Sequence, residues 1–600
     1  MVATALYACA TPSNPAASTP APVKAVDPAA EAKKLDALLE EYFEANLKMS
    51  PIQATFIGDK RYNYLLPNFL SPSAMMASEV FEKHWLTRIE AEIERDVLQG
   101  QARLSYDVFV SQRKSAIEGM AFPGELQPIT QFFSIPSFMA QLGSGQSVQP
   151  FKTVKDYEDW LLRLDAAAIL FDQSIVNMKE GIKQKVVQPK IVVQKAIPQI
   201  AAHIVDDVEK SVFWMPIKSM PDSFSKADKK RLADAYRQRI SAVIVPAYRR
   251  LHSYLKGPYL ANARDTHGYW ALPNGADWYA YQVKSMTTTD RTPEELHQLG
   301  LKEVARLHDE MRKVMKEVKF EGDLSAFFKY VNEDPQFYYT DANALLQGYR
   351  DLQSKVNKLL PKMFDVFPKA DYEVREVEKF RAASSAGASY MPGSPDGSRK
   401  GVFYVNTYDL RRQAKFGMET LSIHEASPGH HFQISIQQEI ESLPRFRRFG
   451  GYTAYAEGWA LYAESIGKEM GMFDDPMQYY GMLDAQLFRA MRLVVDTGLH
   501  YKKWTREQAI EYMKTNSSMA ESDIVAEVER YIVMPGQALA YKVGQIAIRQ
   551  MRNRAEKALG SAFDVKAFHR AILTDGALPL DVLDTKIDEW ISSQKMKKAS

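Results

Sequence analysis

The chain has 600 residues, of which 46% are hydrophobic and 25% are charged, as is ordinary for a globular protein. Lys and Arg number 76 and Asp and Glu 74, so the overall positive charge typical of nucleic-acid-binding proteins is absent and we expect no nucleic-acid partner. Cys9 is the single cysteine, which excludes an intrachain disulfide.

The N-terminus reads MVATALYACATPSNPAASTPAP, in which a short apolar run ends at Cys9 and gives way to Ala, Pro, Ser and Thr. This pattern is similar to the end of a bacterial lipoprotein signal and predicts a lipid anchor at Cys9 and a periplasmic, envelope-bound protein. No Lys or Arg precedes the run, so the signal looks truncated. Residues 1–31 are interpreted as a signal-like segment and a flexible tether; the alternative is a disordered cytoplasmic tail.

Residues 32–260 read as amphipathic helices separated by Pro-rich breaks, and are predicted to form an N-terminal helical lobe. Residues 261–600 are predicted to form a C-terminal lobe that binds a metal. Within it, YEVREV and GVFYVNTY have the β-branched and aromatic residues of strands. The fold prediction is a mainly α, two-lobed body with a deep cleft and a small β element beside the metal helix.

The segment IHEASPGHHFQ, residues 423–433, contains a His-Glu pair at His424 and Glu425 and two further histidines, His430 and His431. Histidines and a carboxylate can hold zinc, and a neighbouring glutamate that does not bind the metal can accept a proton from water. We therefore predict a zinc site in which Glu425 is the general base.

A straight helix cannot bring these histidines together, since His431 would lie about 10 Å from His424 along the axis and His430 would point off its face. Pro428 lacks an N–H group and its ring would clash with the carbonyl of His424, so the helix must break. A bulge that absorbs two residues would select His430 as the second ligand, and one that absorbs three would select His431. We favour His430 and leave His431 as a supporting or alternative ligand.

The third ligand is sought in GYTAYAEGWALYAESIG, where Glu457 and Glu464 are seven residues apart and share one face of a helix. Small residues flank Glu457 and permit close helix packing. We predict Glu457 as the ligand and Glu464 as a supporting residue; the alternative is that both are surface glutamates.

Five segments in order carry a family resemblance: GADWYAYQV with TTTDRTPEELHQLGLKEVARL, SYMPGSPDGSRKGVFYVNT, HEASPGHHFQ, AEGWALYAE and RYIVMPGQALAYKVG. Over about residues 33–595 the chain resembles a bacterial domain-of-unknown-function family, number 885, whose members are often lipoproteins. That family is placed among zincin-like metallopeptidases of the glutamate-ligand type.

The resemblance implies late tyrosines that stabilise the tetrahedral intermediate, for which Tyr531 and Tyr541 are the candidates. It also implies an edge strand that binds the substrate backbone, for which GVFYVNTY is the candidate. The residues expected to bind substrate are Asn406, Arg399 and Lys542.

The functional prediction is a zinc-dependent carboxypeptidase or oligopeptidase with one Zn²⁺ ion and a peptide substrate. The alternatives are a non-catalytic lipoprotein that binds a peptide or envelope ligand, and a metal hydrolase of a non-peptide amide.

Overall fold

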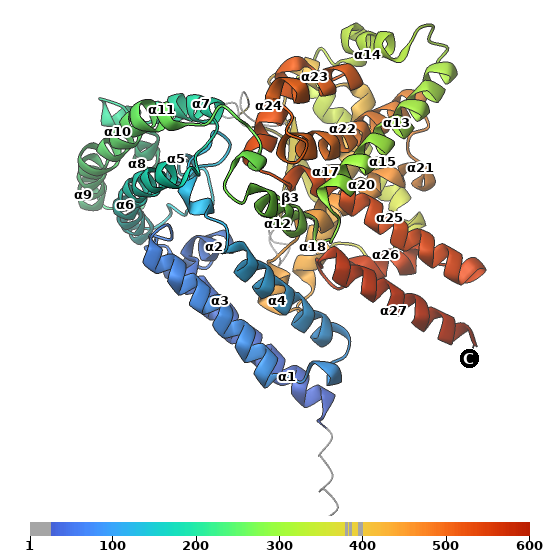
Figure 1. The fold of residues 1–600 in the computed structure, drawn as a ribbon, viewed down its shortest axis with the longest axis horizontal. Helices are drawn as coiled ribbons and strands as arrows, with labels where there is room; N and C mark the ends of the chain where they lie inside the picture. The colour runs from blue at the N-terminus through green and yellow to red at the C-terminus, as the bar shows by residue number, and fades with distance from the viewer. Residues whose placement is uncertain (1–25, 378–381, 383–386, 394–399, 600) are drawn as a thin grey trace, which may run out of the picture.

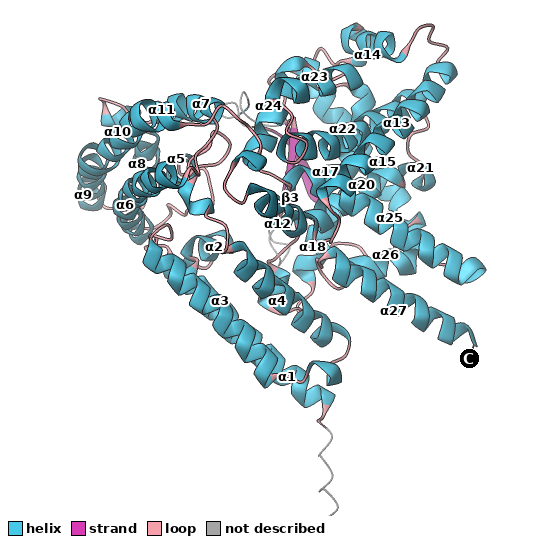
Figure 2. Cartoon of the chain, viewed as in Figure 1, coloured by secondary structure: helices cyan, strands magenta, loops and turns pink. Residues whose placement is uncertain are grey.

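The computed structural model describes residues 26–377, 382, 387–393 and 400–599. Helices dominate this part of the chain, and a single small sheet lies among them (Figure 2). The mainly α prediction and the small β element are confirmed. Cys9 and Arg399 lie outside the described residues.

The first helices are α1 (Pro28–Met49), α2 (Pro51–Phe56), α3 (Pro72–Glu92) and α4 (Gly100–Gly119). Helix α1 begins before the predicted start at Ala32, because the Asp27 side chain accepts a hydrogen bond from the backbone N–H of Ala29 and caps the helix. The next group is α5 (Ile135–Gly143), α6 (Val154–Gln184), α7 (Lys190–Ala201), α8 (Met215–Lys218), α9 (Lys226–Arg239), α10 (Val245–Tyr254) and α11 (Leu260–Asn262).

The chain continues with α12 (Gly275–Thr287), α13 (Pro293–Glu317), α14 (Leu324–Glu333) and α15 (Ala342–Leu359). After the sheet come α17 (Met418–Glu425), α18 (His430–Glu439), α19 (Arg445–Arg448), α20 (Thr453–Ser465), α21 (Gly467–Met470), α22 (Pro476–His500), α23 (Arg506–Asn516), α24 (Glu521–Val533), α25 (Ala540–Leu559), α26 (Val565–Leu573) and α27 (Leu580–Ala599).

Two large hydrophobic clusters divide the helices, and Figure 1 shows α5 to α11 gathered at one end of the molecule. The second cluster holds buried residues between Leu66 and Tyr259. The first cluster joins buried residues of α1, α3 and α4 to those of the C-terminal half. The described core therefore groups the first helices with residues 261–600 rather than with the rest of the predicted lobe 32–260.

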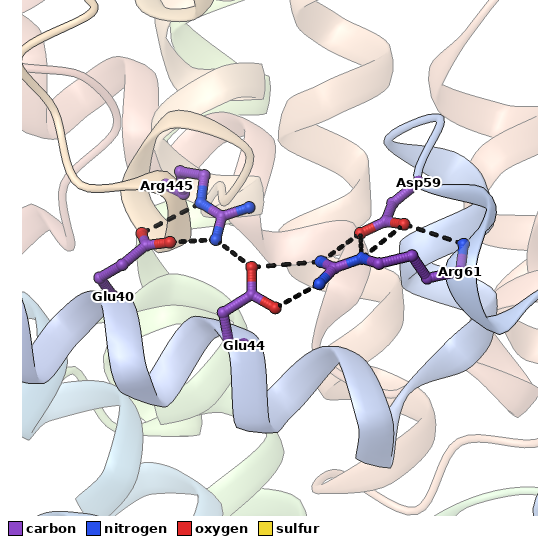
Figure 3. Close-up of polar contacts among 5 residues, drawn as sticks. All are labelled: Glu40, Glu44, Asp59, Arg61 and Arg445. Atoms are coloured by element: carbon purple, nitrogen blue, oxygen red, sulfur yellow. Dashed lines mark hydrogen bonds and ion pairs between the residues drawn. The ribbon is translucent and has the colours of Figure 1, made fainter.

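Polar contacts reinforce this grouping at one edge, where α19 meets α1 (Figure 3). The Arg445 guanidinium pairs with Glu40 and Glu44 of α1. Glu44 also pairs with Arg61, at 2.9 Å, and Arg61 pairs with Asp59 at 2.6 Å. These ion pairs link the N-terminal helices to α19, the short helix that precedes α20.

The sheet has three strands, β1 (Tyr372–Glu376), β2 (Ala388–Met391) and β3 (Gly401–Val405), in the order β1-β3-β2. Strand β3 pairs in parallel with β1 and antiparallel with β2, and all five of its residues are buried. The prediction that GVFYVNTY forms the edge strand is therefore wrong. Its continuous apolar run is that of a strand covered on both faces, whereas β2 is an edge strand and contacts both α17 and α18.

Candidate metal centre

The predicted break in the His-Glu helix is a complete interruption between α17 and α18. Helix α17 ends at Glu425, α18 begins at His430, and the Ser427–Pro428 peptide bond between them is cis. Gly429 lies directly on the end of α17: a Cβ atom there would be 2.0 Å from the carbonyl oxygen of His424. This close approach, which only glycine permits, brings the His430 ring to 4.7 Å from the His424 ring at an interplanar angle of 81°.

Three side chains from three separate helices, α17, α18 and α20, converge at this point. One ligand atom from each of His424, His430 and Glu457 can be chosen so that all lie within 4.8 Å of one another. The Oε2 atom of Glu457 is 3.5 Å from Nε2 of His424 and 3.4 Å from Nε2 of His430. The same oxygen is buried and has no hydrogen-bond partner.

These separations fit a zinc ion. Ligand atoms bound at 2.0–2.1 Å in a tetrahedral arrangement lie about 3.4 Å apart, close to the two measured distances. An orphaned buried carboxylate oxygen costs free energy unless a cation or donor satisfies it. Two imidazoles and one carboxylate are also the donor set of a zinc site that keeps a position open for substrate or water.

Glu464 supports His424 from the other side of the imidazole ring. Its Oε1 atom is 2.7 Å from Nδ1 of His424, and the glutamate is fully buried. A proton on Nδ1 leaves Nε2 free to bind a metal, and carboxylates commonly fix metal-binding histidines in this way. Glu464 therefore has the position of the predicted supporting residue.

The half-buried Glu457 and the fully buried Glu464 dominate the electrostatics of the cluster. Burial opposes protonation of His424, but the nearby carboxylate of Glu457 and the hydrogen bond to Glu464 outweigh it and raise the pKa of the imidazole to about 10. Burial alone would raise the pKa of Glu457, but His424 and His430 hold it well below its usual range. The site thus carries negative charge that favours a cation, and a divalent metal would replace the imidazole proton.

His431 belongs to the sheet side of α18. Its Nδ1 atom is 2.8 Å from the hydroxyl of Tyr390 on β2, and its ring lies 5.0 Å from the ring of Tyr372 on β1. Burial lowers its pKa to about 4. Of the two alternatives left open by the sequence, it is therefore His430 that lies beside His424 and Glu457.

Helix α20 is held against the turn and against α25 by residues next to Glu457. The indole N–H of Trp459 donates a 2.7 Å hydrogen bond to the carbonyl of Pro428. A Cβ at Gly458 would lie 2.4 Å from the Cα of Gly544, so the two glycines let α20 and α25 touch backbone to backbone. The sequence predicted close packing at this point, but not the hydrogen bond from Trp459 to the turn.

A family model described as "Bacterial protein of unknown function (DUF885)" matches residues 51–587. The chain belongs to the DUF885 family. A crystal structure titled as that of a putative lipoprotein from Colwellia psychrerythraea has 30% sequence identity and a TM-score of 0.85, and covers 94% of this chain and 99% of the other. A second, titled as a putative lipoprotein of unknown function from Shewanella oneidensis, has 18% identity and a TM-score of 0.74, and covers 92% and 99%.

No curated protein matches the chain. None of the described helices has the length and apolar composition needed to span a membrane. The family resemblance drawn from the five sequence segments is confirmed, and the titles of both solved structures leave the chemistry of the site open.

In this DUF885 chain, the predicted base Glu425 is the last residue of α17 and is half-buried beside His424. Among the described residues its carboxylate forms no hydrogen bond or ion pair, which leaves both oxygens available for proton transfer. It lies next to His424 at the C-terminal end of α17, and its role as the base stays a prediction.

The predicted tyrosines lie on two helices around one arginine. Tyr541 is in the first turn of α25, one turn before Gly544, and the Arg492 guanidinium stacks 4.3 Å from its ring centroid. Tyr531 is 1% exposed and its hydroxyl accepts a 3.2 Å hydrogen bond from Arg492 Nε. Tyr541, which contacts Arg530 and Gln537 only through 3.4 Å hydrogen bonds, is the freer hydroxyl of the two.

Two residues predicted to bind substrate are occupied within the fold. Lys542 is 1% exposed and lies 3.2 Å from Glu303, with a further 2.8 Å hydrogen bond to Gln545. The Asn406 side chain donates to the carbonyl of Ala382 and accepts from the backbone of Tyr408. Both predictions are corrected: these side chains are buried supports, because the tight packing of α25 and of the loop after β3 encloses them.

Proposed function

We propose that the protein is a zinc-dependent metallopeptidase with carboxypeptidase or oligopeptidase activity. The observation that carries this proposal is the convergence of Nε2 of His424, Nε2 of His430 and the unpartnered Oε2 of Glu457. A buried carboxylate oxygen is rarely left without a hydrogen-bond partner, so the position of Glu457 Oε2 at metal-ligand distances from two imidazoles favours a bound cation. The free carboxylate of Glu425 beside this cluster favours catalysis over metal storage.

His424, His430 and Glu457 would hold the ion, which when bound would polarise a peptide carbonyl and acidify a water molecule. Glu425 accepts the proton of the attacking water and then delivers it to the leaving amine nitrogen. Glu464 keeps the proton of His424 on Nδ1, so that Nε2 stays directed at the site. Tyr541 donates its hydroxyl hydrogen to the developing oxyanion, a role worth about 3 kcal/mol where such donors have been removed.

The peptide substrate is expected to pair with β2. This strand is an edge of the sheet and lies against both α17 and α18, so an extended peptide added to it would run past the metal ligands. Its burial alternates between half-buried and exposed residues, which leaves one side accessible.

We also propose that the protein is attached to the bacterial envelope through a lipid on Cys9. The two relatives described above are titled putative lipoproteins, and each matches this chain over more than 90% of its length. Growth in radiolabelled palmitate would test this, since a Cys9→Ser variant should take up no label. Equal labelling of that variant would rule out Cys9 as the attachment site.

The catalytic proposal is tested with purified protein by measuring bound metal and by following a mixture of unlabelled peptides with mass spectrometry. We expect about one zinc per chain and cleavage of peptide bonds, and we expect Glu425→Gln to keep its zinc but lose cleavage by 10²-fold or more. Cleavage by Glu425→Gln at the wild-type rate would remove Glu425 from the mechanism.

The same measurements separate the rival functions. A protein that binds zinc and retains peptides without cleaving them would be a binding protein on a peptidase scaffold. A protein that binds zinc, ignores peptides and hydrolyses other amides would be a hydrolase of a different substrate class. Absence of metal after supplementation would contradict both hydrolase functions and would leave the non-catalytic binding protein.

A further inference from the structure

Helix α22 lies beside α17, the helix that carries His424, and lines a cavity next to the candidate metal centre. It contacts α17, α20 and α25. A cavity of about 310 Å³ lies along it and is lined by His424 and Glu464 of the centre together with Arg489 and Phe488 of α22. This volume is at the lower end of ligand pockets, which span about 300–1,000 Å³.

Arg489 differs from the arginines around it because it lacks an acidic partner. Arg492, one turn further along α22, pairs with Glu527 at 3.0 Å, and Arg412, in the same cavity wall, pairs with Asp523. Within the described part of the chain, Arg489 forms no ion pair. Its Nη1 donates only to the carbonyl of Ala485 at 3.2 Å, and its Nε is buried without a hydrogen-bond partner.

A second unsatisfied group lines the same cavity. The hydroxyl of Thr420, a residue 3% exposed on α17, also lacks a hydrogen-bond partner. Two acids also lie in the wall: Glu464, whose Oε1 is bonded to His424 and whose Oε2 has no hydrogen-bond partner, and Asp484, which accepts from Ser518 at 3.0 Å. Within the described residues neither acid forms an ion pair with Arg489. The cavity therefore offers a guanidinium whose Nε donor is unsatisfied and a hydroxyl without a partner.

We propose that Arg489 binds a carboxylate of the substrate, so that the protein recognises peptides by a free carboxyl group near the bond that is cleaved. Guanidinium groups bind carboxylates through two parallel hydrogen bonds. Such charge-assisted bonds are roughly twice as strong as hydrogen bonds between neutral groups. This inference rests on the proposed peptidase function and names its substrate class. It moves the anchor from Lys542, which is buried in another network, to Arg489.

The small volume of the cavity favours the C-terminal carboxylate as the group that is bound. A terminal residue fits a short pocket, whereas the interior of a long peptide would have to leave it on both sides. An acidic side chain near the C-terminus has the same chemistry, so the test must distinguish the two.

The experiment measures binding rather than turnover, with zinc-loaded Glu425→Gln protein and isothermal titration calorimetry. Three probes are compared: an N-terminally capped tripeptide with a free C-terminal carboxylate, its C-terminal amide, and an amide that ends in glutamate. We expect the free acid to bind about 10- to 100-fold more tightly than the amide, as for hydrogen bonds to charged groups. Tight binding of the glutamate amide would assign the pocket to a side-chain carboxylate instead.

Adding Arg489→Gln to this protein should bring the acid-to-amide ratio close to one while the zinc content stays unchanged. Arg489→Lys, which keeps the charge but loses the planar fork, should give an intermediate ratio. Arg250→Gln is the control, because Arg250 lies on α10 and pairs with Asp172 on the surface, and it should keep the full ratio.

Equal affinity for acid and amide, no measurable binding of either, or a full ratio in Arg489→Gln would overturn the inference. If the protein binds the carboxylate but is not a peptidase, the experiments give a different result. In that case the wild-type protein would cleave neither peptide, while the preference for the acid and its loss in Arg489→Gln would still be observed.

Discussion

Glu464 supports the proposed metal centre through His424 and is not itself one of the proposed ligands. It is fully buried, holds Nδ1 of His424 through one oxygen, and has no hydrogen-bond partner for the other. Its negative charge strengthens the basicity of the imidazole toward a cation bound at Nε2. A neutral amide of the same shape would keep the hydrogen bond but lose that charge.

We therefore expect Glu464→Gln to weaken zinc binding by about 10- to 100-fold without unfolding the protein. Competition with a chromogenic chelator measures the affinity, and circular dichroism reports the fold. Glu441→Gln, at an exposed glutamate after α18, is the matched control and should bind zinc like the wild type. Unchanged affinity in Glu464→Gln would show that the carboxylate does not support the metal.

Asp496 is a buried acid outside the site whose ionisation affects stability. It accepts hydrogen bonds from the hydroxyl of Tyr279, at 2.6 Å, and from the backbone N–H of Gly536, at 3.1 Å. Burial nevertheless raises its pKa to about 7. Because the folded chain holds this proton more tightly than the unfolded chain, the free energy of unfolding falls as the pH rises from about 4 to 7.

Asp496→Asn should remove that dependence, since asparagine keeps an acceptor for Tyr279 and carries no charge. The variant and the wild type should have similar melting temperatures below about pH 4, and the variant should be the more stable by up to about 4 kcal/mol at pH 8. Differential scanning calorimetry over this pH range measures the difference. A difference that does not grow with pH would mean that Asp496 ionises normally.

The turn between α17 and α18 is the element on which the proposed centre depends. It adds two residues to the usual i, i+4 spacing of the histidines in a helical zinc motif, and Gly429 fits only because it lacks a side chain. A Cβ at this position would meet two carbonyl oxygens at 2.0 and 2.3 Å. The backbone would have to shift, and His430 would move with it.

Gly429→Ala should therefore lower the free energy of unfolding by about 1–3 kcal/mol, as overpacking does, and reduce zinc affinity by 10-fold or more. Gly417→Ala is the control, because Gly417 precedes the same helix and a Cβ there meets nothing within 4 Å. Thermal melting and chelator competition on both variants provide the comparison. Wild-type zinc affinity in Gly429→Ala would show that the turn tolerates a side chain.

The sequence was informative where local chemistry decides the structure. Pro428 cannot continue a helix, so the break after His424 follows from one residue. Likewise Thr292 and Glu295, three residues apart, form a capping box at the start of α13. The strand order did not follow, because pairing between β1 and β3 joins segments about 30 residues apart. A buried apolar strand looks the same in sequence whether it is central or at an edge.

Arg489 and Trp459 show a second limit of sequence reasoning. Nothing in the local pattern distinguishes Arg489 from Arg492, since the difference lies in whether a glutamate from α24 comes within reach. The bond from Trp459 to the carbonyl of Pro428 likewise needs two helices in contact. Lys542 was misjudged for the same reason: its partner Glu303 lies on α13, more than 200 residues earlier.

At the scale of the whole molecule, the C-terminal half that carries the centre shares its core with the first helices of the chain. Helix α4 contacts α12 and α27, and α1 contacts α19. The predicted boundary near residue 260 follows a change in sequence texture, but amphipathic helices do not reveal which other helices they pack against. The N-terminal helices are therefore expected to be required for stable folding of the metal-binding half.

Two arginines two residues apart on α19 allow a test of how this junction is held together. Arg445 pairs with Glu40 and Glu44, but its side chain is 33% exposed and solvent screens its charge (Figure 3). Arg447 is 2% exposed, and its Nη1 donates to Gln101 at 2.9 Å and to Ser105 at 3.1 Å, both on α4. Its Nη2 donates to the carbonyl of Asp575.

Exposed ion pairs contribute about 0–1 kcal/mol, whereas removing a buried charged donor leaves its partners unsatisfied at a cost of about 3 kcal/mol or more. Arg445→Gln should thus change the melting temperature slightly and Arg447→Gln should lower it clearly, with the N-terminal helices becoming more sensitive to proteolysis first. Calorimetry and limited proteolysis of the two variants measure this. Equal effects of the two substitutions would mean that burial of Arg447 does not hold the N-terminal helices on the C-terminal half.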